Sequence, residues 1–254
     1  MNLSLQKANF WKRISAFLFD FILLGMIAVG LAAALSALFG YNSYTERMSE
    51  LYEKYEEEYG IDLDISEEEY MKLPDDKKQA YADANTAMNE DEETLYVYNM
   101  LFNLALIIIS LSLLITYLIF EFAVPMFFGN GQTLGKKVFG IAVMRTSSVK
   151  LTGPVLFIRS VLGKFTMETM IPVLILMMVV FGDLGFVGTI LLILILVLEF
   201  ITVASTKTRS AIHDLLSDTV VVDLASQYIF ESEEALIEYK KQIHKEEVEK
   251  KNNY

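Results

Sequence analysis

The 254-residue sequence predicts an all-α membrane protein: a four-transmembrane-helix bundle with both termini in the cytoplasm, a helical extracytoplasmic loop and a small cytoplasmic β element. Three observations predict this fold class. The residues are 54% hydrophobic with a mean hydropathy of +0.39, which is too apolar for an ordinary soluble protein of this length. The apolar residues gather in four long runs. Lysine and arginine cluster in some of the segments between these runs and avoid others.

Four apolar runs have the length, or nearly the length, that crosses a bilayer, for which about 20 residues are needed. They cover residues 14–39, 95–120, 169–182 and 184–198. The last two runs reach spanning length only by including an acid, Glu168 or Glu199, at one end. A cleavable signal peptide is the competing interpretation of the first run, since Lys12 and Arg13 precede it. Its length and the presence of Asp20 favour a transmembrane helix.

Lysine and arginine predict the orientation, because cytoplasmic segments retain positive charge. The N-terminal segment contains basic residues and no acid, and the same holds for residues 122–167, between the second and third runs. The basic residues of these segments are Lys7, Lys12, Arg13, Lys136, Lys137, Arg145, Lys150, Arg159 and Lys164. Residues 40–94 instead contain runs of acids. We therefore expect residues 40–94 outside the cell and both termini in the cytoplasm.

The acidic segment 40–94 is expected to be a small helical subdomain. Ser66 followed by Glu69 predicts a capping box at the start of a helix, and Pro74 suits the first turn of the next helix. A solvated helical cap is the simpler role, and capture of cations by the clustered carboxylates is the other. A calcium-binding EF-hand is excluded, because Glu67 stands at the position of its obligatory glycine.

Composition also excludes several classes of function. The sequence contains no cysteine and two histidines, His213 and His244, so we expect neither a disulfide-stapled ectodomain nor a zinc site. We expect no catalytic residue, metal or cofactor, and no enzyme activity. His213 is assigned to helix packing, because adjacent helical residues such as His213 and Asp214 do not face each other. The formal net charge of -12 disfavours nucleic acid as a partner, and the lipid bilayer is the expected one.

Three motifs, in this order along the chain, resemble the RDD family. They are Arg13 and Asp20 in the first run, residues 131–137 after the second run, and residues 209–219 after the fourth. The family is named for one arginine and two aspartates. Arg13 and Asp20 fit the arginine and the first aspartate. Asp214 is the choice for the second, with Asp218 as the alternative candidate. The resemblance implies a small multi-pass protein of the bacterial cytoplasmic membrane, with transport of ligands or ions suggested for some members.

We accordingly expect four parts. Residues 1–39 form the cytoplasmic N-terminus and the first span, 40–94 the outer loop, 95–223 the remainder of the membrane core, and 224–254 a charged cytoplasmic tail. The resemblance covers about residues 8–40 and 95–223. On the tail, Leu236, Tyr239 and Ile243 make a weak apolar stripe, which either docks a partner or is solvated.

Asp20 is the residue that most needs an explanation, since a charge inside a membrane helix costs about 2.5 to 3.5 kcal/mol. Glu168 and Glu199 stand almost equally far from Asp183, the expected tip of the hairpin between the last two runs. With Glu121 at a similar depth, the four acids form a layer in the inner third of the membrane. One interpretation is architectural, with the acids acting as counter-ions to basic residues of the bundle. Those residues would be Arg13, Lys136, Arg159, Lys164 and Arg209.

The other interpretation is a pathway for monovalent cations or protons, because neighbouring carboxylates away from water exchange protons for cations. It favours a small transporter or cation/proton exchanger with Asp20 as the ion-binding carboxylate. Arg13, Glu121, Arg159, Glu168, Glu199 and Asp214 are the further candidates for this pathway or for structural ion pairs. The alternative function is a non-catalytic subunit or regulator that scaffolds another membrane protein or associates with itself.

The segment after the second run combines glycines with basic residues. Gly131, Thr133, Gly135, Lys136 and Lys137 predict a turn at the membrane surface that contacts anionic lipid headgroups. Residues 139–144 and 219–222 are β-prone and are expected to pair as a small cytoplasmic sheet.

Overall fold

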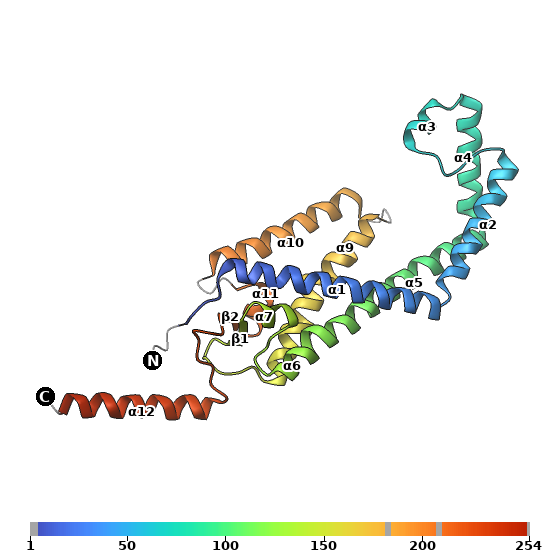
Figure 1. Cartoon of the computed structure of the whole chain (residues 1–254). Coiled ribbons are helices and arrows are strands. Elements are labelled where there is room, and N and C mark those ends of the chain that lie inside the picture. Colours follow the sequence, from blue (N-terminus) through green and yellow to red (C-terminus); the bar gives the residue numbers. More distant parts are fainter. Residues whose placement is uncertain (1–4, 181–183, 207–209, 253–254) are drawn as a thin grey trace. The chain divides into compact units, whose positions relative to one another are not determined.

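The computed structural model describes residues 5–180, 184–206 and 210–252 (Figure 1). The chain divides into two compact units. The core unit comprises Met1–Ala28 and Leu113–Tyr254, and the loop unit comprises residues 29–112. The expected hairpin tip at Asp183 and the expected counter-ion Arg209 lie outside the described residues.

Four helical spans in the described residues are long and apolar enough to cross a membrane, which confirms the predicted number. The first is α1 (Phe10–Leu38) and the last is α10 (Gly185–Ser205). The second joins α5 (Glu92–Tyr117), the π-helical segment η1 (Leu118–Ala123) and α6 (Val124–Phe128). The third joins α8 (Gly153–Phe157), the π-helical segment η2 (Ile158–Met170) and α9 (Ile171–Val180).

The second and third spans are longer than predicted. The second was expected to end at residue 120 but continues through Pro125 to Phe128, and the third was expected to begin at residue 169 but begins at Gly153. The prediction was based on runs of residues without charge. The second predicted span therefore ended before Glu121, and the third did not include Arg159 and Lys164. These charges are buried against protein partners, and paired charges of this kind are compatible with a membrane helix.

The two π-helical segments carry four charged residues of the core unit: Glu121, Arg159, Lys164 and Glu168. In η1 the Val124 N–H donates to the Ile119 carbonyl, and in η2 the Ile171 N–H donates to the Thr166 carbonyl, both five residues back. In a π-helix, residues that are four or five positions apart lie on the same face. In an α-helix, residues five positions apart do not. Arg159, Lys164 and Glu168 therefore share one face of η2.

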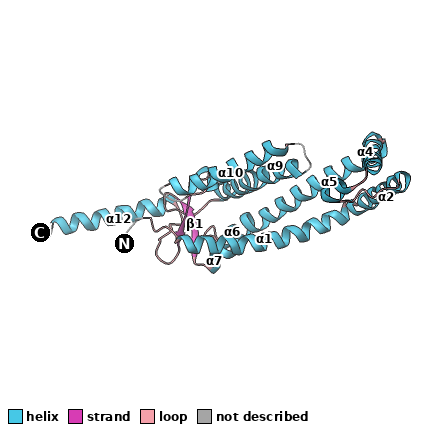
Figure 2. Cartoon of the chain, turned by 90° about the horizontal axis from the view of Figure 1, so that it is seen from above, coloured by secondary structure: helices cyan, strands magenta, loops and turns pink. Residues whose placement is uncertain are grey.

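A two-stranded antiparallel sheet closes one end of the core unit (Figure 2). Strand β1 (Ile141–Arg145) pairs with β2 (Thr219–Asp223), with Val143 opposite Val221, so the predicted sheet is present. Both faces are covered: one packs against Ala16 of α1, and the other packs against Leu5 and Ile229. Burial on both faces explains the unbroken apolar runs in these strands.

The chain enters and leaves the bundle at this sheet. The Ala8 N–H donates to the Val221 carbonyl at 3.2 Å, and the Lys150 N–H donates to the Phe230 carbonyl at 2.9 Å. Helix α12 (Glu233–Asn252) follows, and Leu236 and Tyr239 of the apolar stripe pack against Val149 and Phe230. The beginning of the stripe thus docks on the chain itself. Which side of the membrane this end faces stays a prediction.

The loop unit is helical, as predicted. It contains α2 (Tyr41–Tyr59), α3 (Glu67–Lys72) and α4 (Asp75–Glu90), around a core of Tyr55, Leu63, Ala84 and Met88. The capping box at the start of α3 is present in both directions: Ser66 Oγ accepts from the Glu69 N–H, and Glu69 accepts from the Ser66 N–H. Pro74 directly precedes α4 as its N-cap and is not in its first turn.

Candidate functional site

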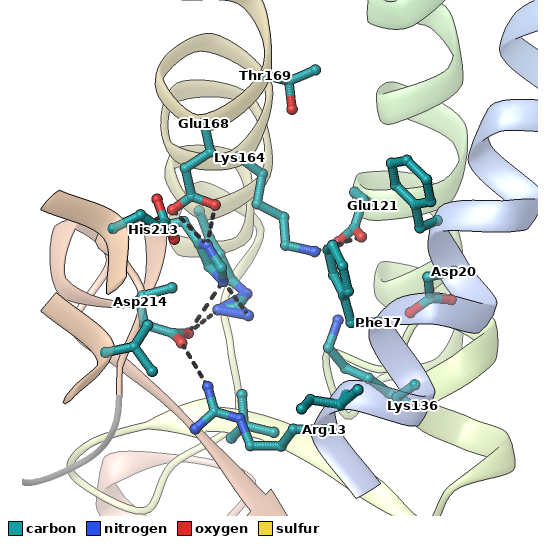
Figure 3. A pocket seen from close by; sticks show the side chains of 18 of the residues that line it. Arg13, Phe17, Asp20, Glu121, Lys136, Lys164, Glu168, Thr169, His213 and Asp214 are labelled. Atoms are coloured by element: carbon teal, nitrogen blue, oxygen red, sulfur yellow. Dashed lines mark hydrogen bonds and ion pairs between the residues drawn. The ribbon is translucent and has the colours of Figure 1, made fainter. Parts of the chain in front are cut away.

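The membrane helices of the core unit surround a cavity of about 930 Å³, with the sheet and two short helices at one end. The short helices are α7 (Leu134–Val138) and α11 (Ile212–Leu216). Figure 3 shows charged side chains from α1, η1, η2, α7 and α11 converging in this cavity. All seven residues named from the sequence as pathway or ion-pair candidates line it: Arg13, Asp20, Glu121, Arg159, Glu168, Glu199 and Asp214.

Asp20 is buried against the beginning of α7. Its carboxylate accepts hydrogen bonds from Thr133 Oγ1 at 2.5 Å and from the Gly135 N–H at 2.7 Å. The approach is so close that a Cβ on Gly135 would lie 2.4 Å from the Ala16 carbonyl oxygen and 2.9 Å from the Asp20 carboxyl carbon. The partner of Asp20 is therefore a hydroxyl and a backbone amide, and this contact fastens α7 to α1.

The segment 131–137 folds into the protein, which differs from the headgroup-facing turn that the sequence predicted. Gly131, Thr133, Gly135 and Lys136 are all buried, and among the residues that form α7 and its N-cap, Lys137 and Val138 are exposed. The physical reason is the contact with Asp20, which draws the glycine backbone inward. Burial and the nearby Lys164 ammonium lower the pKa of Lys136 to about 8, against a smaller opposite effect of Glu121.

Arg159 and Asp214 form the most buried ion pair of the described cavity. Arg159 is 3% exposed and Asp214 is 1% exposed, and Thr219 Oγ1 lies 3.0 Å from both Arg159 Nη1 and Asp214 Oδ1. The second carboxylate oxygen, Oδ2, lies 3.9 Å from Arg13 Nη2. Burial opposes ionisation of Asp214, but Arg159, His213 and Arg13 outweigh it and hold the pKa of this carboxyl below its usual range.

His213 lies at the centre of this network, whereas the sequence assigned it to helix packing. Its Nε2 lies 3.0 Å from Arg159 Nη2, and its Nδ1 lies 2.7 Å from a Glu168 carboxylate oxygen. A guanidinium only donates hydrogen bonds, so Nε2 accepts and Nδ1 holds the proton that it donates to Glu168. Helix α11 is only five residues long, and from it both His213 and Asp214 reach Arg159.

A second buried ion pair links the second and third spans. Lys164 Nζ lies 2.5 Å from Glu121 Oε1, and both side chains are mostly buried. One turn away, Ser160 Oγ donates to the backbone carbonyl of Glu121. These contacts join the π-helical segments η1 and η2.

Glu199 differs from the other acids of the cavity. It lines the cavity from α10, and it makes no hydrogen bond or ion pair with any residue that the structure describes. Among the described residues, its charged neighbours are Glu168 from η2 and Asp214 from α11, both of the same sign. Glu199 therefore adds a carboxyl group that no described cation of the cavity contacts.

The structure also separates the two candidates for the second family aspartate. Asp214 lies in the cavity, while Asp218 is exposed and accepts a hydrogen bond from Thr146 Oγ1 at 2.6 Å. Sequence reasoning missed the roles of His213, Ser160 and Thr219. Of these, His213 carried a signal, since it directly precedes Asp214.

The pH dependence of stability is expected to report on His213, which faces Arg159, Glu168 and Asp214. Burial, reinforced by Arg159, lowers the pKa of the His213 imidazole. Below about pH 6.5 the unfolded chain therefore binds a proton at this residue that the folded chain does not. Stability should fall as the pH drops from 7 to 5. The apparent melting temperature should fall less over this range in His213→Gln, and an identical fall in both proteins would contradict the assignment.

Most of the chain matches a known protein family. Residues 7–218 match the model of the RDD family. This match includes all the cavity residues named above up to Asp214, and it ends just before β2. No curated protein and no solved structure matches the chain.

Proposed function

Since this chain belongs to the RDD family, we propose that it is a small membrane transporter that exchanges cations for protons in the cavity of its core unit. The observation that carries the proposal is Glu199, a carboxylate on a membrane helix without a partner among the described residues. A negative charge held away from bulk water needs a positive charge near it. A proton and a bound cation can supply that charge in turn.

The geometry supports a division of roles among the acids. Asp20, which the sequence favoured as the ion-binding carboxylate, has both oxygens bonded by Thr133 and Gly135. Glu121 is occupied by Lys164. We assign these two acids to the architecture of the site and Glu199 to the exchange. Glu168 on η2, which His213 holds through a hydrogen bond, is a charged neighbour of Glu199 and supports it.

We place the protein in the bacterial cytoplasmic membrane with both termini in the cytoplasm. The support for this placement is the family and the basic residues at the sheet end of the bundle. The acid-free N-terminal segment and residues 131–150 lie at that end, in agreement with the retention of positive charge on the cytoplasmic side.

Proton movement in proteoliposomes tests the proposal. Liposomes that contain the purified protein and a pH-sensitive dye would receive pulses of sodium, potassium or an organic ammonium salt. Wild type should move protons in response to at least one cation, and Glu199→Gln should lower that rate at least tenfold. Asp218→Asn is the matched control, because it removes an exposed acid outside the cavity. An inactive wild type, or a Glu199→Gln variant as fast as wild type, would remove the exchange function.

One observation favours a second candidate, a non-catalytic subunit that holds another membrane protein. Asp20, Glu121, Glu168 and Asp214 are all engaged by protein groups, as a static scaffold requires. A partner that co-purifies in fixed stoichiometry, together with no proton movement by wild type, would favour this role over exchange.

A further inference from the structure

We propose that the cation bound in this cavity is an organic cation with apolar substituents, held by Glu199 through its charge and by aromatic side chains through the rest of its surface. The inference rests on the exchange function proposed above and names its class of substrate.

The size of the cavity favours an organic ligand. A volume of about 930 Å³ lies within the range of about 300–1,000 Å³ found for small-molecule sites. A metal cation stripped of water needs several oxygen ligands at once. In the part of the chain that the structure describes, no group of three His, Asp or Glu residues could hold a metal ion. A single unpaired carboxylate suffices for an organic cation, whose charge is spread over a larger surface.

The lining of the cavity that Glu199 shares fits such a surface. Phe200 follows Glu199 on α10, and Phe17 and Phe21 line the cavity from α1. The Phe17 and Phe21 rings stack with their centroids 5.9 Å apart. Tyr117 adds a further ring, and its hydroxyl is bonded to Thr169 at 2.7 Å. The faces of aromatic rings attract cations, and the same rings shield apolar substituents from water.

Two of the aromatic residues that line the cavity are also exposed on the surface of the bundle. Phe17 is 61% exposed and Phe200 is 74% exposed, although both lie on membrane helices that border the cavity. A cation with apolar groups concentrates in a bilayer, where it meets these exposed rings. A hydrated alkali ion has no such preference for the membrane.

The basic residues of the cavity do not favour an anionic ligand. Lys164 pairs with Glu121, and Arg159 pairs with Asp214. Lys136 Nζ lies 3.2 Å from Thr133 Oγ1, and its electrostatic neighbours include Asp20 and Glu121. An anionic lipid headgroup would compete with these acids for the basic side chains. It would also be repelled by Glu199, which has no described counter-ion.

Binding of tetraphenylphosphonium to the purified full-length protein in neutral detergent tests the inference, with equilibrium dialysis at pH 8 as the readout. Wild type should bind one cation per chain. Glu199→Gln should weaken binding at least tenfold, and Phe200→Ala about threefold to tenfold. Phe186→Ala is the matched control on the same helix, because Phe186 is exposed and does not line the cavity. Unchanged melting temperatures would show that the variants fold.

The outcomes separate this inference from the exchange function. Glu199-dependent proton movement driven by sodium or potassium, without tetraphenylphosphonium binding, would overturn the organic ligand and leave exchange standing. Glu199-dependent binding without proton movement would support the ligand class and remove exchange. Binding that Glu199→Gln leaves unchanged would overturn the inference. Phosphatidylglycerol binding that Lys136→Met abolishes, in place of cation binding, would overturn it as well and identify an anionic lipid site.

Discussion

Removing one charge of the Arg159–Asp214 pair is expected to lower the free energy of unfolding by about 3–5 kcal/mol, because the remaining charge stays buried without its counter-ion. Both side chains are almost fully buried. In Asp214→Leu, Arg159 also loses the acceptor that orients it toward His213 and Thr219. At about 2–4 °C per kcal/mol for a chain of this size, the apparent melting temperature in detergent should fall by about 6–20 °C.

The matched control is an ion pair on the outside of the same unit. Arg145 contacts Glu233 at 2.9 Å, but these side chains are 33% and 61% exposed, and such pairs contribute about 0–1 kcal/mol. Arg145→Met should therefore shift the melting temperature by about 4 °C or less. The double variant Arg159→Met with Asp214→Leu should regain part of the loss, since no isolated charge remains. An Asp214→Leu protein as stable as Arg145→Met would show that this pair does not hold the fold.

The sequence was most informative where a single residue departs from its surroundings. Charges inside or at the ends of apolar runs are rare enough to be noticed one by one. For this reason the sequence predicted one layer that contains Asp20, Glu121 and Glu199, and all three line the cavity. The capping box of Ser66 and Glu69 was also predictable, because its partners are three residues apart. Local patterns of this kind need no knowledge of the tertiary fold.

Features that depend on pairing between distant segments were not predictable. The ends of the second and third spans were misplaced, because counting charge-free residues does not show that Lys164 meets Glu121 across two helices. The π-helical segments leave no periodic signal that distinguishes them from α-helix. The role of His213 was underestimated, because the rule that adjacent helical residues do not face each other holds for long helices. Helix α11 is a single turn, and its adjacent residues His213 and Asp214 both reach Arg159.

The inward fold of residues 131–137 depends on a contact of the same kind, and it carries a second large effect. Gly135→Ala places a Cβ 2.4 Å from the Ala16 carbonyl oxygen, so the backbone of α7 or α1 must move. Overpacking of this kind costs about 1–3 kcal/mol. The movement also lengthens the hydrogen bonds to Asp20, and each such bond to a charged group contributes about 1.5–3 kcal/mol. We expect a loss of about 3 kcal/mol or more in the free energy of unfolding.

A double-mutant cycle with Asp20 separates the two causes, because only the hydrogen-bond part depends on the carboxylate. If α7 is fastened to α1 through Asp20, Gly135→Ala should lower the melting temperature less in an Asp20→Ala background than in wild type. Gly153→Ala is the control, since a Cβ there meets nothing within 4 Å. Equal shifts in both backgrounds would attribute the whole effect to the clash with Ala16. Asp20 would then be no longer needed to hold α7, and its carboxylate would return as a candidate for the exchange that we assign to Glu199.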